Sequence, residues 1–450
     1  MAVKFLASNY IESERKVYGL YVMQQRAIPA AADGLKAGGR RALWTARDGH
    51  KYKTATLAGA TMPIHPHGEC SPAINTLAAP YGNNIPLFTG IGAFGTMLDP
   101  TAYGASRYTA VMASKFAQDV LFKDIEIVPM MSNYDDTLEE PVHFLPLVPI
   151  VLLNPTEGIA VGFATNILPR GLEDIIAHQL AHLKNKPKDA TKNELMPKFL
   201  PTNSAAFKAE KTDKGFAFFF NGDYEEVNAT TIKITNLPYG LLHEKLVDKI
   251  EDLIEKGYIV DKIDGSKDKV NIEIKFKKGV LKELTKADVL KMLGMTVKHN
   301  ENLNVLDFAG EGVWSANPAD LIEKFTAWRL GFYTTRYERL RDLLNIDIQR
   351  YRDIKTAIDN NVGGVARKIQ NRGELKDFLS EISIVYIDYI ADLPVYRFTE
   401  DEKIKNDERI KEAELQLKEY LDIIGSRQRQ VDIYISELND ILNKYNKGQY

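Results

Sequence analysis

The chain has 450 residues, of which 44% are hydrophobic and 26% charged, and these values are typical of a globular protein with two or three domains. Its one cysteine, Cys70, excludes an internal disulfide and a zinc site built from several thiolates. No apolar run is long enough to span a bilayer, and charged residues interrupt the N-terminus where the core of a signal peptide would lie. We therefore expect a cytoplasmic protein without membrane contacts.

Charge is distributed unevenly along the chain. The net charge is -3, but residues 1–60 hold ten Lys and Arg against four Asp and Glu, a net charge of +6. Such asymmetry favours a polyanion bound by the N-terminal part, while a solvated basic face is the alternative.

Residues 1–128 contain four short helical patterns followed by a glycine-punctuated extended segment, "NNIPLFTGIGAFGTM". The pattern fits a helix-turn-helix with a wing, preceded by an N-terminal arm, although any small α+β domain would also fit. The helical patterns are "SERKVYGLYVMQQRAIP", "GGRRALWTARD", "KTATLAGATM" and "SPAINTLAA".

Residues 129–316 form a predicted α/β segment. Two apolar runs, "PVHFLPLVPIVLL" and "GIAVGFAT", predict buried strands. Two alternating runs, "TTIKITNLP" and "KVNIEIKFKKG", predict half-exposed strands, and the amphipathic "LLHEKLVDKIEDLIEKG" between them predicts a helix.

Residues 317–450 show long helical periodicity. Asn317 and Pro318 form a helix start, and apolar residues then recur every three or four positions. We predict an outgoing helix over 317–372, a compact helical head over 373–402 and a returning helix over 403–450 that breaks at Gly425–Ser426. This arrangement favours an antiparallel coiled coil whose tip dimerises, while a plain helical bundle is the alternative.

The pair Arg107–Tyr108 in "GASRYTAVMA" is a candidate reactive site. A free phenol has a pKa of about 10, so it attacks poorly unless a cation or metal favours the phenolate. Arg107 stays protonated and offers a planar fork that matches phosphate oxygens. Other basic and imidazole residues of the same predicted domain could converge on such a site, namely Arg26, Lys36, Arg40, Arg41, His65 and His67.

Two kinds of nucleotide or metal site are excluded by the motifs that the sequence lacks. There is no Gly-Lys pair, hence no P-loop, and no Asp-x-Asp clamp for paired Mg²⁺. Phosphate contact or local hydrogen bonding is a better interpretation of His65 and His67 than metal ligation, so we expect no metal site on this chain.

Five motifs occur in order: "RAIPAAADGLKAGGRRALW", "HPHGE", "GIGAFGT", "GASRYTA" and "EGIAVGFATNI". Together they resemble the breakage-reunion subunit of type IIA DNA topoisomerases, and the resemblance covers essentially the whole chain. It implies a winged-helix DNA gate, an α/β tower and a coiled coil that ends in a dimerisation gate. Because no ATPase segment follows the coiled coil, the chain looks most like the phage members of this family.

The resemblance also implies residue roles. Tyr108 would attack a DNA phosphodiester and become linked to the 5′ end, and Arg107 would steady the scissile phosphate. Ile159 would wedge between base pairs, although a core strand residue is its alternative interpretation. The resemblance implies that Arg26 and His67 are also catalytic, with one of the histidines helping the proton move. All the remaining matched residues would contact phosphates around the cleavage site: Arg26, Lys36, Arg40, Arg41, His65 and His67.

The partners implied are double-stranded DNA, a second copy of this chain, and a subunit that carries the ATPase and metal-binding domains. Mg²⁺ and ATP would be bound mainly by that subunit. Cys70 and Ile74 stand where bacterial members carry a serine and an acid, so we expect weak quinolone sensitivity. The other interpretations are a non-catalytic winged-helix DNA-binding protein and, less favoured, a tyrosine recombinase.

Overall fold

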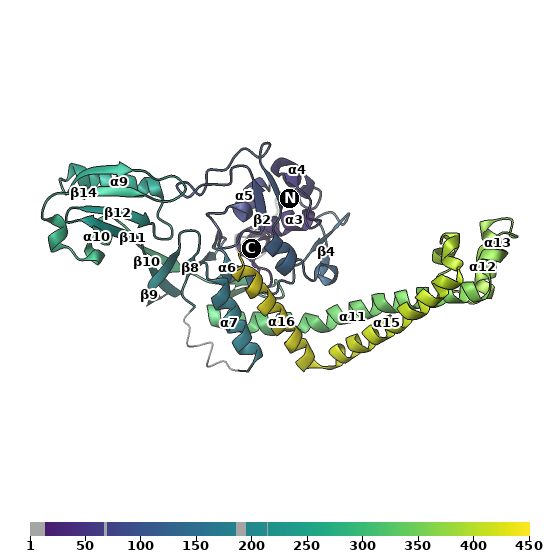
Figure 1. Cartoon of the computed structure of the whole chain (residues 1–450). Coiled ribbons are helices and arrows are strands. Elements are labelled where there is room, and N and C mark those ends of the chain that lie inside the picture. The colour runs from purple at the N-terminus through teal and green to yellow at the C-terminus, as the bar shows by residue number, and fades with distance from the viewer. Residues whose placement is uncertain (1–13, 67–69, 186–194, 214) are drawn as a thin grey trace, which may run out of the picture. The chain divides into compact units, whose positions relative to one another are not determined.

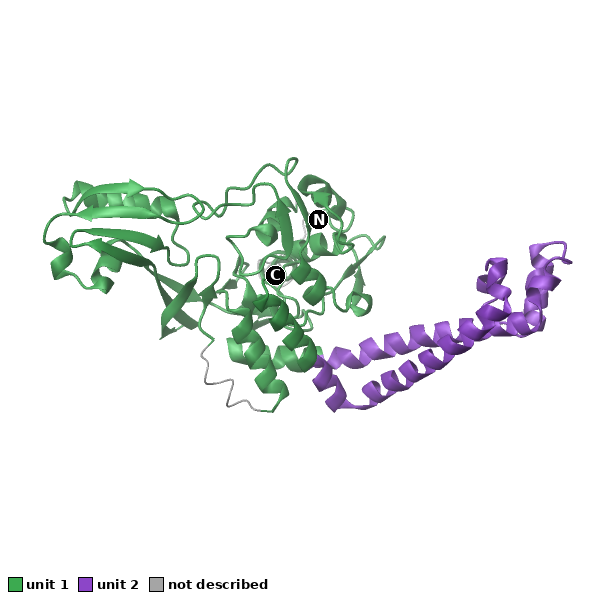
Figure 2. Ribbon diagram, in the orientation of Figure 1, with its two compact units in different colours: residues 1–329, 435–450 green, residues 330–434 purple. Residues whose placement is uncertain are grey.

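The computed structural model describes residues 14–66, 70–185, 195–213 and 215–450. The chain forms two compact units, one of residues 1–329 with 435–450 and one of residues 330–434 (Figure 2). Within the described residues, no helix is both long and apolar enough to cross a membrane.

The N-terminal part of the first unit contains the expected short helices. They are α2 (Lys16–Val22), continued by the π-helical turn η2 (Met23–Ala27), then α3 (Ala37–Thr45), α4 (Thr54–Thr61) and α5 (Ser71–Ala78) (Figure 1). Strands β1 (Tyr52–Lys53), β3 (Ala110–Ala113) and β2 (Phe88–Ile91) form an antiparallel sheet in the order β1-β3-β2. The sheet is a small platform beside the helices, and β3 begins two residues after Tyr108.

The next segment does not contain the buried strand that the sequence predicts for residues 141–153. The run 141–153 forms irregular backbone and one short helix, α6 (Ile150–Leu153), because Pro146 and Pro149 lack the N–H groups that a ladder needs. Its apolar residues are still buried, as expected. Around it lie η3 (Ala117–Leu121), η4 (Ile125–Ile127), the pair β4 (Met130–Ser132) and β5 (Glu139–Pro141), the hairpin β6 (Thr156–Ile159) and β7 (Ala164–Ile167), and α7 (Leu172–Leu183).

Two four-stranded antiparallel sheets follow. One has the order β15-β10-β9-β8 and the other the order β11-β12-β14-β13. Their strands are β8 (Lys198–Phe199), β9 (Ser204–Thr212), β10 (Gly215–Asn221), β11 (Asp223–Asn228), β12 (Thr231–Asn236), β13 (Ile259–Asp264), β14 (Ile272–Phe276) and β15 (Thr296–Glu301). The short pair β16 (Asn304–Leu306) and β17 (Val313–Ser315) leads to the long helices. Strands β12 and β14 lie in the two alternating runs, so that prediction is confirmed.

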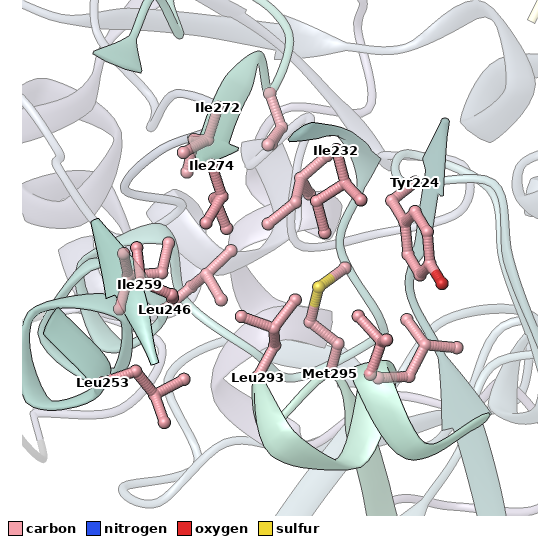
Figure 3. Close-up of a cluster of buried hydrophobic side chains, with 14 of the residues drawn as sticks. Tyr224, Ile232, Leu246, Leu253, Ile259, Ile272, Ile274, Leu293 and Met295 are labelled. Carbon is pink, nitrogen blue, oxygen red and sulfur yellow. The ribbon is translucent and has the colours of Figure 1, made fainter. Parts of the chain in front are cut away.

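The second of these sheets has its own core. Ile232, Ile272 and Ile274 project from β12 and β14 and are fully buried against apolar residues of α9 (His243–Glu255) and α10 (Lys286–Met292), which follows the turn η5 (Val280–Glu283) (Figure 3). The apolar face of the strands, which repeats every second residue, thus packs against the apolar face of the helices, which repeats about every 3.6 residues. Met97, from the N-terminal part of the chain, packs against this core.

Residues 318–446 form the long helices and the turns between them, and residues 330–434 of this stretch make up the second unit. Helix α11 (Pro318–Asp359) starts at the expected Asn317, whose side chain accepts from the Asp320 amide at 2.9 Å. It ends before residue 372, because Asn361 adopts φ 52° and starts a separate turn. The other helices are α12 (Val362–Val365), α13 (Arg372–Glu381), α14 (Ile387–Ala391), the turn η6 (Val395–Phe398), α15 (Glu400–Gly425) and α16 (Arg427–Asn446).

Helices α11 and α15 run antiparallel. Ion pairs Arg352–Glu414 (2.7 Å) and Lys355–Asp407 (2.6 Å) join them in opposite chain directions. The expected break at Gly425–Ser426 separates α15 from α16. The connection between α11 and α15 forms a small core around Ile354, Leu379 and Ile390, so the compact segment has an apolar centre of its own.

Candidate active site

Tyr108 lies on a tight turn and exposes its ring. Its amide donates to the Ala105 carbonyl at 2.8 Å, and the side chain is 71% exposed. The Arg107 guanidinium carbon lies 4.7 Å from the centre of the phenol ring. The Arg107 cation thus makes a cation–π contact with an exposed tyrosine ring.

The start of α4 holds this turn. The Thr54 amide donates to the Thr109 carbonyl at 3.1 Å, and the Ala55 amide donates to the Ser106 carbonyl at 3.2 Å. These N–H groups belong to the first turn of a helix and have no intrahelical acceptor, so the loop satisfies them. The backbone on both sides of Tyr108 is therefore fixed, while its phenol is left free at the surface.

Lys53 is a further cation beside Tyr108. Its Nζ lies 3.5 Å from the Tyr108 carbonyl oxygen and its side chain is exposed. Sequence reasoning counted this lysine in the basic N-terminal region but did not assign it to the site. Only the pairing of β1 with β3, which sets Lys53 opposite Ala110, brings the two segments together.

A second group of expected residues surrounds the β6–β7 hairpin. Arg26 is exposed at the end of η2, and the next carbonyl, that of Ala27, lies so close to Gly158 that a Cβ there would approach it to 1.9 Å. Lys36 reaches the same hairpin, because its Nζ donates to the Glu157 carbonyl at 2.5 Å. Burial lowers the pKa of the Lys36 ammonium, an effect that the Glu157 carboxylate opposes.

Ile159 occupies the tip of that hairpin and is 87% exposed. Val161 and Phe163, at 45% and 42%, extend the apolar tip. The run contributes to strands β6 and β7 as predicted, but the prediction of burial is wrong, since the hairpin exposes Ile159, Val161 and Phe163 to solvent. The hairpin tip is apolar, and Arg26 and Lys36 lie beside its base. Apolar side chains flanked by cations are typical of surfaces that insert a side chain into nucleic acid.

Arg40 and Arg41 face the interior. Arg40 pairs with Asp33 through Nε at 2.7 Å, and Arg41 pairs with Glu140 through Nε at 2.5 Å. Both arginine side chains are at most 10% exposed. Their donors are directed at carboxylates, so these two arginines do not stand at the surface where the sequence interpretation set them.

Asp33 organises the loop that precedes α3. Its carboxylate is fully buried and accepts from Arg40, from the Leu35 amide at 3.0 Å and from the Phe144 amide at 3.0 Å. A carboxylate with this many donors is well satisfied in the interior. It fixes the chain just before Lys36.

His65 packs against α2. Its Nε2 lies 3.1 Å from the Tyr21 hydroxyl, and the two rings are stacked with centroids 6.3 Å apart. His67 lies outside the described residues, so its predicted role stays a prediction. Ile74 is fully buried in α5.

The described residues contain no group of three or more His, Cys, Asp or Glu side chains that could hold a metal ion.

Comparison with known proteins identifies the class. Residues 26–439 match the family described as the A subunit of DNA gyrase/topoisomerase IV. The match covers most of the chain, and the chain belongs to this family. It is thus an A-type subunit of the type II DNA topoisomerases, which are isomerases.

A phage protein is among its relatives. The chain is 29% identical to the DNA topoisomerase medium subunit of Enterobacteria phage T4, over 94% of this chain and 97% of that protein. It is 33% identical to the A subunit of DNA topoisomerase 4 from Borreliella burgdorferi, over 61% of this chain and 42% of the relative. It is 29% identical to the A subunit of DNA gyrase from Rickettsia conorii, over 97% of this chain and 54% of the relative. The chain thus spans about half the length of its bacterial relatives or less, and nearly all of the phage relative. The expected likeness to phage members is confirmed.

Proposed function

We propose that this chain cuts and rejoins DNA through a covalent bond between Tyr108 and a 5′ phosphate, as one component of an ATP-dependent enzyme. The observation that carries the proposal is the exposed Tyr108 ring beside the Arg107 guanidinium, on a turn whose backbone is fixed by α4. A nucleophile must expose its reacting atom to a substrate as large as a duplex, and among the exposed tyrosines Tyr108 is the one beside Arg107 in the matched motif.

The proposed step is a transesterification. The Tyr108 hydroxyl gives its proton to a base, and its oxygen attacks a backbone phosphorus. The bond from phosphorus to the 3′ oxygen breaks, and that oxygen takes up a proton and leaves as the 3′ hydroxyl. Arg107 and Lys53 supply positive charge near the phosphoryl oxygens, which carry the developing charge. Because one phosphate diester replaces another, the freed 3′ hydroxyl can reverse the reaction without ATP.

Binding of the duplex is assigned to the hairpin surface. Arg26 and Lys36 contact phosphates, and Ile159 enters a base step and bends the DNA, as apolar wedges do in other proteins. His65 and His67 remain proposed phosphate contacts, with His67 also moving a proton. Arg40 and Arg41 contribute by fixing the Asp33 loop and α3 rather than through direct contact.

The complete enzyme requires other chains. We assign the ATPase and the Mg²⁺ site to a partner subunit, in the cytoplasm of a bacterial host, since the described residues offer no acidic metal cluster. The helices α2–α5 with the β1-β3-β2 sheet act as a winged-helix gate, and α11 with α15 as a coiled coil. A second copy of the chain docks at the head, where Val395 and Tyr396 are each 66% exposed.

The test is the variant Tyr108→Phe, reconstituted with Mg²⁺ and the partner subunit on supercoiled and linear duplex DNA. Covalent protein–DNA adducts on a denaturing gel should fall to background, while DNA affinity stays within about threefold of wild type, since the phenol hydroxyl is one contact among many. The matched control is Tyr258→Phe, which alters a 48% exposed tyrosine of the tower segment and should leave adducts unchanged. Adducts that persist in Tyr108→Phe refute the assignment. A wild-type protein that binds DNA but never forms adducts favours a non-catalytic DNA-binding protein.

A further inference from the structure

We infer that Thr54 is a positioning residue for Tyr108 and acts through a buried hydroxyl pair with Thr109. The inference rests on the proposed function, because it concerns the geometry of the attacking phenol. It joins two segments that are 55 positions apart in the chain.

The contact between the two threonines is buried and double. Their Oγ1 atoms lie 2.8 Å apart, and the Thr54 amide donates to the Thr109 carbonyl at 3.1 Å. Thr54 has no exposed surface and Thr109 only 2%. A hydrogen bond in such a dry environment is strong, and each hydroxyl would lose its partner if the other were removed.

The methyl group of Thr109 lies close to Gly104. A Cβ built on Gly104 would lie 3.0 Å from the Thr109 methyl, tighter than ordinary contact. Threonine is also stiff about its first side-chain torsion, because two heavy atoms branch from Cβ. With the methyl against Gly104 and the hydroxyl on Thr54, the Thr109 side chain is held from both sides.

This arrangement matters because the Tyr108 side chain contacts the Arg107 guanidinium at the surface rather than a packed core. Its ring is 71% exposed, so packing does not fix the phenol. The position of the phenol oxygen therefore depends on the backbone of residues 106–109, which α4 holds through Thr54 and Ala55. In-line attack demands close alignment of the reacting atoms, and a small displacement costs a large part of the rate.

Three variants separate positioning from plain stability. Thr54→Val keeps the side-chain shape but removes the hydroxyl and leaves that of Thr109 unpaired. Thr54→Ser keeps the hydroxyl and removes a methyl. The double variant Thr54→Val/Thr109→Val removes both hydroxyls, so no buried polar group is left unsatisfied and stability should largely return.

The experiment measures the single-turnover rate of adduct formation, DNA affinity and urea unfolding for the full chain reconstituted with its partner subunit. We expect Thr54→Val to lower the adduct rate about tenfold or more with DNA affinity unchanged, and Thr54→Ser to stay within about threefold of wild type. The double variant should recover stability but not the adduct rate. If Thr54→Val proves too unstable to assay, the adduct rate of the double variant tests the inference in its place.

Three results overturn the inference while leaving the proposed function intact. They are a wild-type adduct rate in Thr54→Val, an equal loss in Thr54→Ser and Thr54→Val, and a double variant whose rate returns together with its stability. A wild-type chain that forms no adduct overturns the proposed function, and this inference with it.

Discussion

The cations of helix α3 and those around the β6–β7 hairpin come from one stretch of sequence but lie in opposite environments. Arg40 and Arg41 are buried against Asp33 and Glu140. Arg26 is exposed beside the hairpin, and Lys36 reaches it from the end of the Asp33 loop. The buried ion pairs fix the conformation of the Asp33 loop. Arg26 and Lys36, which lie beside the hairpin, are the cations available to bind a polyanion.

The largest effect on stability is expected from disrupting the buried ion pair between Asp33 and Arg40. Asp33→Asn removes the charge that compensates Arg40, and an uncompensated charge in the interior lowers the free energy of unfolding by about 3–5 kcal/mol. Urea unfolding measures the loss. Asp48→Asn is the matched control, because the Asp48 side chain is 40% exposed and its ion pair with His50 should contribute about 1 kcal/mol or less. Equal losses in the two variants would contradict the comparison.

At the hairpin, a substitution should reduce DNA bending and cleavage while leaving the free energy of unfolding almost unchanged. Ile159→Ala leaves unfolding within about 0.5 kcal/mol of wild type, because the side chain is already in solvent. It should reduce DNA bending, measured by energy transfer between dyes at the duplex ends, and lower cleavage about tenfold, or about 1.4 kcal/mol. Val260→Ala, at a 58% exposed position of β13, is the control. Unchanged bending in Ile159→Ala would remove the wedge assignment.

The salt dependence of DNA binding sharpens the contrast between Lys36 and Arg40. Lys36→Met should lower the slope of log affinity against log salt by about 1, the signature of one lost phosphate contact. Arg40→Met, assayed below its unfolding temperature, should keep the wild-type slope because its guanidinium is directed at Asp33. The reverse pattern would mean that Arg40 leaves its pair to bind DNA.

The smallest expected effect is on the pH dependence of the free energy of unfolding. Burial lowers the pKa of His143, with the Asp33 carboxylate opposing the shift and Arg40 adding to it. The unfolded chain therefore takes up a proton near pH 6.5 that the folded chain resists, so stability is fully present above that pH and declines as pH falls below it. His143→Gln should flatten this decline in unfolding measurements between pH 5 and 7.5. A wild-type slope in the variant would assign the decline to other groups.

Helix patterns were predictable because they depend on local spacing and caps. The segments that became α3, α4, α5 and α9, the start at Asn317 and the break at Gly425–Ser426 all follow from residues within one or two turns. The run 141–153 was not predictable by the same rules. Its apolar residues are buried as expected, but its prolines prevent strand pairing, and composition alone does not separate these cases.

The sequence by itself determined the family, the order of elements and the candidates Tyr108 and Arg107, since these reside in motifs of a few adjacent residues. The tertiary structure decided which cations reach the surface and which are paired inside. It also brought Lys53 and Thr54 to the turn of Tyr108 and turned the Ile159 run outward. Charge and hydrophobicity are properties of a residue, but burial and hydrogen bonding depend on what distant segments pack beside it, and that information is absent from any local pattern.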